Sequence, residues 1–220
     1  MFSDGIPSFV MDFTIPSDIK SLLDDLDQFI ADVIRPIENE DDNIRFFDHR
    51  REDARTDWER DGLPNEEWEA LLVRMKREAD AAGFLRWHLP KRFGGKDGTN
   101  LGMAIVREHL ARKGLGLHND LQNESSIIGN FPTVLMMEKF GTKAQQTEWI
   151  PKLLEGSARI GFGLTEPLHG SDATWMETTA TRDGDEWVIS GESIGTRDYT
   201  TQLMTTSLPG LPATPVKDTA

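Results

Sequence analysis

Cysteine is absent from this chain of 220 residues. Its absence excludes a disulfide framework, a thiolate nucleophile and a zinc site built from cysteines. It is compatible with a reducing compartment but does not identify one. The chain also lacks any apolar run approaching the roughly 20 residues that a transmembrane helix needs. We therefore expect no membrane insertion.

Positive charge is also scarce, because 24 Lys and Arg face 38 Asp and Glu and leave a formal net charge of -14. This surplus of acid disfavours binding to nucleic acid or to an anionic membrane, and no basic cluster offsets it locally. The first twenty residues carry three aspartates and a single cation, Lys20. They resemble neither a signal peptide nor a transit peptide. The sequence predicts a soluble protein of undetermined localisation.

Apolar residues at helical spacing dominate the first two thirds of the chain. With 37% hydrophobic residues the chain can form a sizeable core. Residues 41 to 62 are mostly charged and predict a surface excursion with short helical pieces. The spacing predicts five helices. They run over residues 17–36 with Ser17 as N-cap, 65–82, 100–113, 126–140, and 143–156 divided at Pro151.

The hydrophobic period changes from helical to extended at Ala158. Residues 176 to 191 then read as two strands around an Asp-Gly-Asp turn at residues 183–185, which is a hairpin signal. After Glu192 the composition turns to Thr, Pro and Gly without any period, which is typical of a flexible tail. The predicted fold class is mainly α with a partial β-domain. The expected domains are residues 1–157 (helical), 158–192 (partial β) and 193–220 (tail).

Three familiar kinds of catalytic or binding motif fail in this sequence. GGKDGT at residues 94–99 lacks the first glycine and the Ser or Thr of a phosphate-binding loop. The five histidines lie far apart and form no HxxxH or HxxE pair supported by carboxylate ligands, so we expect no metal site. Ser171 lies in GSD rather than in the GxSxG of a hydrolase.

The segment LTEPLHGSD at residues 164–172 is more informative. Thr165 and Glu166 should end a strand, Pro167 should fix the exit of the chain, and Gly170 would let the backbone approach a ligand closely. Unpaired backbone groups and two hydroxyls at such a strand end suit a planar heterocycle with a pyrimidine edge and a phosphate. An ordinary β-turn explains the same residues, and spacing alone does not decide between the two.

Several motifs together resemble the acyl-CoA dehydrogenase family. They are LPKRFGG, then GxxxQxxxWIPxLLxG from Gly141, then TEPxxGSD and GDxWxIxG. The combination is highly specific and the resemblance covers residues 17 to 192. It implies an N-terminal helical domain followed by the first strands of a middle β-domain, with FAD bound between them and a C-terminal helical bundle beyond. The reaction implied is α,β-dehydrogenation of an acyl-CoA thioester.

The resemblance also implies roles for particular residues. Phe162, Gly163, Leu164 and Thr165 match positions that contact the flavin, and the Thr hydroxyl there stabilises the reduced ring. Ser171 matches a serine that contacts the FAD diphosphate and the thioester substrate. Donors placed where the ring gains negative charge stabilise the transition state more than the ground state. Glu166 is not the base in this family, so we assign no catalytic residue.

The match to the family ends at Glu192, before the region that holds the catalytic glutamate and the tetramer-forming surfaces of its members. We therefore expect a truncated chain without turnover of its own. A non-catalytic helical module that associates with a full-length relative, in a homo- or hetero-oligomer, is the alternative. An acyl-CoA oxidase or flavin monooxygenase of the same fold also stays open. Acyl chain length and electron acceptor are not determined.

Overall fold

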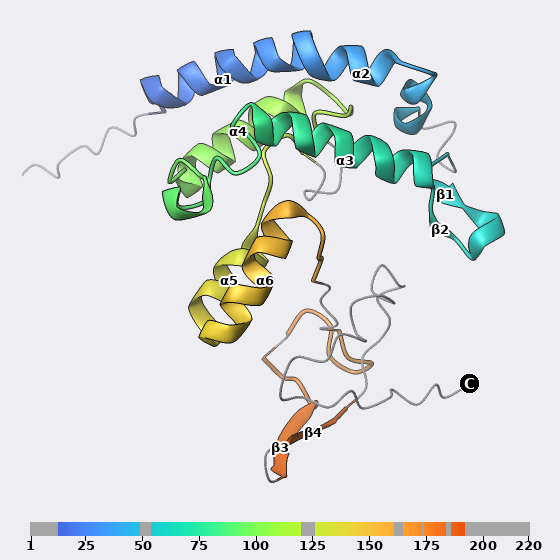
Figure 1. The fold of residues 1–220 in the computed structure, drawn as a ribbon, viewed down its shortest axis with the longest axis vertical. Helices are drawn as coiled ribbons and strands as arrows, with labels where there is room; N and C mark the ends of the chain where they lie inside the picture. The colour runs from blue at the N-terminus through green and yellow to red at the C-terminus, as the bar shows by residue number, and fades with distance from the viewer. Residues whose placement is uncertain are drawn as a thin grey trace, which may run out of the picture. The chain divides into compact units, whose positions relative to one another are not determined.

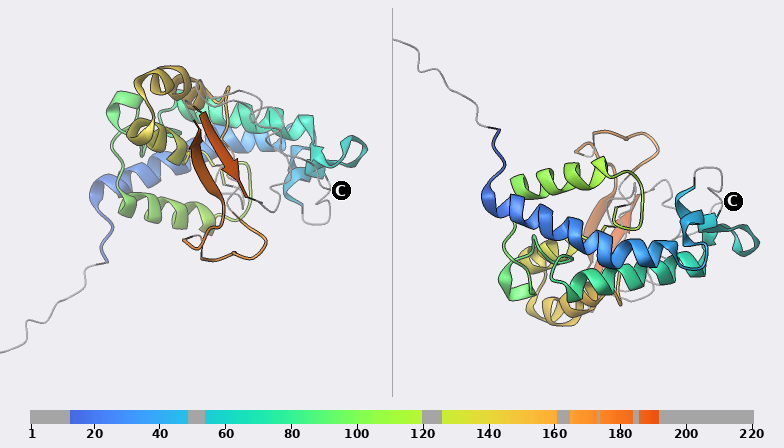
Figure 2. Two further views of the ribbon diagram at one scale, coloured as in Figure 1. Left: turned by 90° about the horizontal axis from the view of Figure 1, so that it is seen from below. Right: turned by 90° about the horizontal axis from the view of Figure 1, so that it is seen from above.

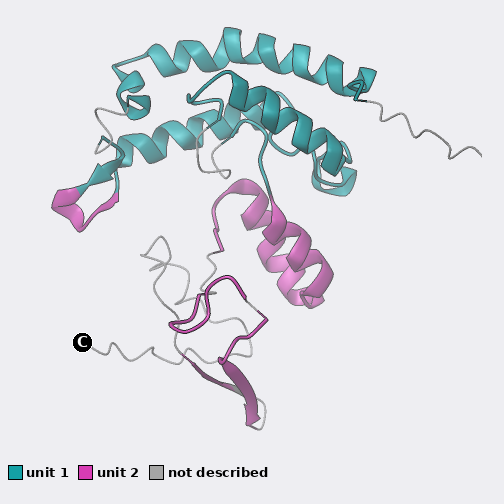
Figure 3. Ribbon diagram, turned by 180° about the vertical axis from the view of Figure 1, so that it is seen from behind, with its two compact units in different colours: residues 1–57, 64–130 teal, residues 58–63, 131–220 magenta. Residues whose placement is uncertain are grey.

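The computed structural model describes residues 13–48, 54–119, 126–160, 165–172, 174–183 and 186–191. The chain divides into two compact units, coloured separately in Figure 3. The first unit comprises residues 1–57 and 64–130, and the second comprises 58–63 and 131–220. The domain boundary expected at residue 157 stays a prediction.

Figure 1 shows the helices and strands in chain order. Among the described residues before 131, the named helical elements are α1 (Ser17–Phe29), a π-helical segment η1 (Ile30–Ile34), α2 (Arg35–Asn39), α3 (Glu66–Ala81), α4 (Asn100–Arg112) and the 3-10 turns η2 (Asn43–Phe47), η4 (Trp58–Arg60) and η5 (Lys91–Phe93). The two-residue strands β1 (Thr56–Asp57) and β2 (Leu63–Pro64) flank η4. The later elements are α5 (Pro132–Phe140), α6 (Lys143–Glu155), β3 (Thr179–Asp183) and β4 (Glu186–Ser190).

The first helix is longer than the sequence predicted. Ser17 is its first helical residue, Pro16 occupies the N-cap position, and no side-chain hydrogen bond caps this end of the helix. The predicted end near Pro36 is wrong, because the chain continues through η1 into α2. Pro36 lies directly after the π-helical turn, where the regular hydrogen bonds of an α-helix from residue i to residue i−4 are already interrupted.

Helix α3 confirms its prediction in both bounds and buried face. Asn65 caps it by accepting a hydrogen bond from the Glu67 N–H at 2.9 Å. Gly83 follows it with a φ of +77°, the left-handed conformation that glycine adopts without strain. The predicted apolar face is buried and consists of Trp68, Leu71, Leu72 and Met75.

Helix α4 also has its predicted bounds, with the Thr99 side chain accepting from the Gly102 N–H at 3.0 Å. It packs against α1, as the two views in Figure 2 show. A polar contact joins the two helices, because Asp27 of α1 lies 2.6 Å from His109 Nε2 and 2.8 Å from Lys113 Nζ. These two partners lower the pKa of Asp27, although its partial burial opposes them.

The fourth predicted helix starts six residues later than expected. Ile127 and Gly129 donate their backbone N–H groups to His118 at 3.1 Å and to Leu85 at 2.9 Å, so these residues bond to distant segments instead of to a helical turn. Phe131, with φ -117° and ψ 55°, directly precedes Pro132, and a residue before proline disfavours the helical conformation. Only Pro132–Phe140 is therefore helical.

The predicted division of the fifth helix at Pro151 is wrong, because α6 runs unbroken from Lys143 to Glu155. A proline inside a helix costs about 3 kcal/mol. Trp149, Ile150 and Leu153 are buried around it, and each buried apolar side chain contributes about 1.5–3 kcal/mol. Their packing outweighs the proline.

Strands β3 and β4 form the predicted hairpin, antiparallel and with Thr179 opposite Ser190 and Thr181 opposite Val188. The described residues 158–160 and Thr165 form no strand, and residues 161–164 of the expected strand lie outside the described part of the chain. Among the described residues, no helix combines the length and apolar character needed to cross a membrane.

Candidate functional site

A tight turn brings Glu166 and His169 together in the second unit. The Glu166 N–H donates to the His169 carbonyl at 3.3 Å, and the His169 N–H donates to the Glu166 carbonyl at 3.2 Å. Pro167 fixes the backbone at the start of this turn, and the Leu168 side chain is 77% exposed. The turn that the sequence suggested is thus present, and its outer side faces solvent.

The carboxylate of Glu166 ties this turn to the segment before β3. Its Oε2 accepts from the Glu177 N–H at 2.6 Å and its Oε1 accepts from the Thr178 N–H at 2.8 Å. Glu166 is buried. Hydrogen bonds from Thr178 and from the Glu177 backbone lower the pKa of this carboxyl and keep it ionised. Glu166 therefore has a structural role, and both of its oxygens already accept hydrogen bonds.

Asp172 is likewise engaged within its own loop. Its Oδ1 accepts from the Thr174 N–H at 3.1 Å and from the Thr174 hydroxyl at 2.5 Å. The Thr174 hydroxyl, with the backbone N–H, lowers the pKa of Asp172. This local turn shapes the loop that follows Ser171.

The predicted cofactor residues fall into two groups. Phe162, Gly163 and Leu164 lie outside the described residues. Thr165 and Ser171 stand at the two ends of the described loop, and both are exposed. A Cβ added to Gly170 would meet no atom within 4 Å, so the backbone next to Ser171 is open to a ligand. Exposed hydroxyls and an open backbone are compatible with the flavin that the resemblance implies.

The structure also brings together three side chains that could bind a metal ion, a grouping that the sequence did not predict. Ligand atoms of Glu166, His169 and Glu177 all lie within 4.8 Å of one another. His169 Nε2 is 3.5 Å from Glu177 Oε1, and the Trp175 ring stacks on the imidazole with centroids 5.5 Å apart. The spacing Glu-x-x-His at residues 166–169 was a signal for the first pair, whereas Glu177 joins it only through the folding of the loop.

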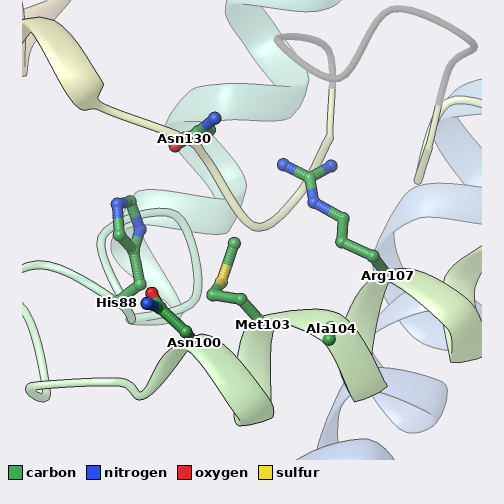
Figure 4. Close-up of a pocket in the computed structure, with 6 residues that line it drawn as sticks. All are labelled: His88, Asn100, Met103, Ala104, Arg107 and Asn130. Carbon is green, nitrogen blue, oxygen red and sulfur yellow. The ribbon is translucent and has the colours of Figure 1, made fainter.

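A separate pocket of about 280 Å³ lies within the first unit, as Figure 4 shows. Four of its residues follow one another along α4, and the other two come from the connections that face this helix. The lining residues are His88, Asn100, Met103, Ala104, Arg107 and Asn130. Its volume is at the lower end of the roughly 300–1,000 Å³ of small-molecule sites.

The chemistry of this pocket is that of a fixed cation beside neutral groups. Burial lowers the pKa of His88, and the positive charge of Arg107 lowers it further. The imidazole is therefore neutral at pH 7 while Arg107 is charged. None of the six lining residues carries a carboxylate, so these side chains supply no carboxylate base.

Comparison with known proteins identifies matching relatives over most of the described chain. Residues 41–157 match the family model described as acyl-CoA dehydrogenase, N-terminal domain. Acyl-CoA dehydrogenase FadE12 of Mycobacterium tuberculosis is 35% identical over 117 residues, which are 53% of this chain and 29% of that protein. Glutaryl-CoA dehydrogenase of Desulfococcus multivorans is 30% identical over 183 residues, 82% of this chain and 40% of that protein.

Solved structures show the same fold. A candidate acyl-CoA dehydrogenase of Mycobacterium abscessus aligns with a TM-score of 0.57 and 27% identity, over 81% of this chain and 42% of that one. The ChsE4–ChsE5 complex of Mycobacterium tuberculosis aligns with a TM-score of 0.53 over 84% of this chain and 39% of that one, and its 19% identity shows the fold alone. This chain thus spans well under half the length of the proteins that it resembles.

Proposed function

Because the chain belongs to the acyl-CoA dehydrogenase family, we propose that it provides the N-terminal helical domain and the first part of the flavin-binding middle domain for the FAD-dependent α,β-dehydrogenation of an acyl-CoA thioester. The match of residues 41–157 to the family carries this proposal. The exposed ends of the loop at Thr165 and Ser171 support it.

The loop would bind the cofactor through hydroxyl and backbone groups. Thr165 would donate its hydroxyl to the pyrimidine edge of the flavin, the part of the cofactor to which the family resemblance also assigns residues 162–164. Ser171 would donate to the FAD diphosphate and lie near the thioester of the substrate. Bound FAD would supply the acceptor for the hydride that leaves the β-carbon.

We assign no catalytic base, and we expect no turnover by this chain alone. Glu166, the carboxylate within the motif, is buried and already accepts two backbone hydrogen bonds. Moving it toward a substrate would break both hydrogen bonds, which the N–H groups of Glu177 and Thr178 donate to it.

The visible absorption spectrum of the purified chain, before and after addition of FAD, tests the cofactor site. We expect a bound-flavin spectrum that weakens in Thr165→Ala and in Ser171→Ala. Gly170→Ala should weaken the bound-flavin spectrum too. The added methyl group would occupy the open space beside the backbone that the cofactor would use, and it would contact no protein atom within 4 Å. Thr147→Ala is the matched control, since that hydroxyl donates to the Lys143 carbonyl within α6.

A chain that ignores FAD, or whose three loop variants bind FAD as well as the wild type does, would contradict this assignment. Acyl-CoA added to the FAD-loaded chain should leave the flavin oxidised. Bleaching of the flavin by acyl-CoA would show that oxidation of the substrate by the flavin needs nothing beyond these residues, and would contradict the expectation.

The non-catalytic interaction module is a second candidate. Met136 and Phe140 of α5 are 46% and 74% exposed. Exposed apolar side chains of this kind favour a surface that binds another protein. Mixing the chain with a full-length family member and separating the products by size tests this idea. A mixed oligomer that survives in Thr165→Ala would indicate a role in assembly that is independent of flavin binding.

A further inference from the structure

We propose that Glu166, His169 and Glu177 form a binding site for a divalent transition-metal ion such as Zn²⁺. Two carboxylates and one imidazole are a ligand set that Zn²⁺ accepts, with a further position left for water or a ligand. The site uses side chains that the proposed flavin contacts do not use, and it does not depend on the proposed function.

The backbone holds two of the ligands in place before any ion binds. The paired hydrogen bonds between Glu166 and His169 fix these residues across the turn. The bond from the Glu177 N–H to Glu166 Oε2 fixes the backbone of the third ligand against the first. A site in which the protein has already ordered its ligands loses less entropy when it binds an ion.

The imidazole of His169 gives an independent indication of a ligand. Its side chain is only 13% exposed, and Nε2 is enclosed without a hydrogen-bond partner among the described residues. A buried polar atom in this state is costly and calls for a missing partner. The stacked Trp175 ring orients the imidazole, so that Nε2 lies next to the carboxylate of Glu177.

The distances suit an ion between the ligands better than direct contact. His169 Nε2 and Glu177 Oε1 are 3.5 Å apart, beyond a normal hydrogen bond. Bonds of about 2.0–2.2 Å at a tetrahedral Zn²⁺ place two ligand atoms roughly 3.3–3.6 Å apart. All three ligand atoms lie within 4.8 Å of one another, so the wider separations require a small closure. Glu177 can supply it, because its side chain is 66% exposed and can rotate.

Glu166 can join such a site without losing its structural role. Each carboxylate oxygen has two lone pairs, so an oxygen that accepts a backbone N–H can still bind an ion. Hydrogen bonds of this kind commonly orient the carboxylate ligands of metal sites. Imidazole in the set favours Zn²⁺ and its neighbours over Mg²⁺ and Ca²⁺, which prefer oxygen ligands alone.

The test is a titration of the FAD-free full chain with Zn²⁺ against a chromophoric chelator. Visible absorption of bound Co²⁺ provides a second readout. We expect one ion per chain. Glu177→Gln and His169→Gln should each weaken binding by at least the roughly 10- to 100-fold that the loss of an outer partner costs, because each removes a direct ligand.

His109→Gln is the matched control, since it removes an imidazole that pairs with Asp27 in the first unit. Glu177→Gln keeps its backbone bond to Glu166, so its fold should persist even if His169→Gln misfolds. Zn²⁺ binding that is absent, unchanged in Glu177→Gln, or equally weakened in His109→Gln would overturn the proposal. Flavin absorption is measured separately, so failure of one site leaves the other assignment intact.

Discussion

The carboxylate of Glu166 accepts the backbone N–H of Glu177 at 2.6 Å, eleven residues further along the chain. This bond closes the loop that contains Thr165 and Ser171 onto the residues that lead into β3. One buried acid thus sets the geometry of both proposed ligand sites in the second unit. Its value to the protein is the shape of the loop rather than proton transfer.

Replacing Glu166 with Gln should loosen this loop. The amide presents an NH₂ group where one of the two backbone N–H donors needs an acceptor. Hydrogen exchange of the Glu177 and Thr178 amides should become at least several-fold faster, while α3 keeps its protection. Glu148→Gln, at an exposed ion pair with Lys152, serves as the control. Unchanged exchange at both amides would show that Glu166 does not hold the loop closed.

Glu38 should be important for the stability of the first unit. It is 2% exposed, and its carboxylate bonds to Arg35 at 2.5 Å and to the Leu117 N–H at 2.7 Å. Glu38→Ala leaves that buried N–H without an acceptor, so we expect a loss of about 1–3 kcal/mol in the free energy of unfolding. Urea denaturation measures it. Glu108→Ala, which breaks an exposed pair with Arg112, should cost about 0–1 kcal/mol.

Gly95→Ala should destabilise the fold severely, whereas Gly170→Ala should not. A Cβ at Gly95 would lie 1.8 Å from the Leu89 carbonyl oxygen, and a backbone atom cannot move aside as a flexible side chain can. Overpacking typically costs about 1–3 kcal/mol, and a clash this close belongs at the upper end. Thermal melts of the two variants measure the difference. Equal melting temperatures would contradict this account of the LPKRFGG segment.

Stability should fall as the pH drops below neutrality because His118 is buried. Burial lowers its pKa below the ordinary 6.5, and the positive charge of Arg35 lowers it further. The unfolded chain then binds a proton near pH 6.5 that the folded chain refuses until lower pH. The stability that the neutral His118 contributes is therefore fully present above pH 6.5. It is lost as the pH falls toward the lowered pKa of His118 in the folded chain.

Urea denaturation at pH 7.5 and at pH 5.5 tests this pH dependence. The midpoint of unfolding should fall between the two pH values, and the fall should be smaller in His118→Gln than in the wild type. The buried His88 adds a similar term, so some decrease should remain in that variant. A decrease that is identical in the variant would assign the pH dependence to other groups.

The sequence by itself determined the elements whose signals are local. Helices α3 and α4 have close to their predicted bounds, because a side-chain acceptor at the cap and a helical apolar face act within a few residues. The hairpin of β3 and β4 was predicted from the Asp-Gly-Asp signal between two strand-like segments, and the two strands pair as expected. The family resemblance is likewise a property of motifs, and the matched model confirms it.

Tertiary structure decided the features that depend on contacts between distant residues. Ile127 leaves the helical pattern because His118 and the segments around it offer other partners, and Pro151 stays within α6 because the surrounding residues are buried. Glu177 reaches Glu166 and His169 only when the intervening loop folds. Local propensities are worth about 1 kcal/mol per residue or less, and about 3 kcal/mol for a proline inside a helix, so the packing of several buried side chains and long-range hydrogen bonds can override them.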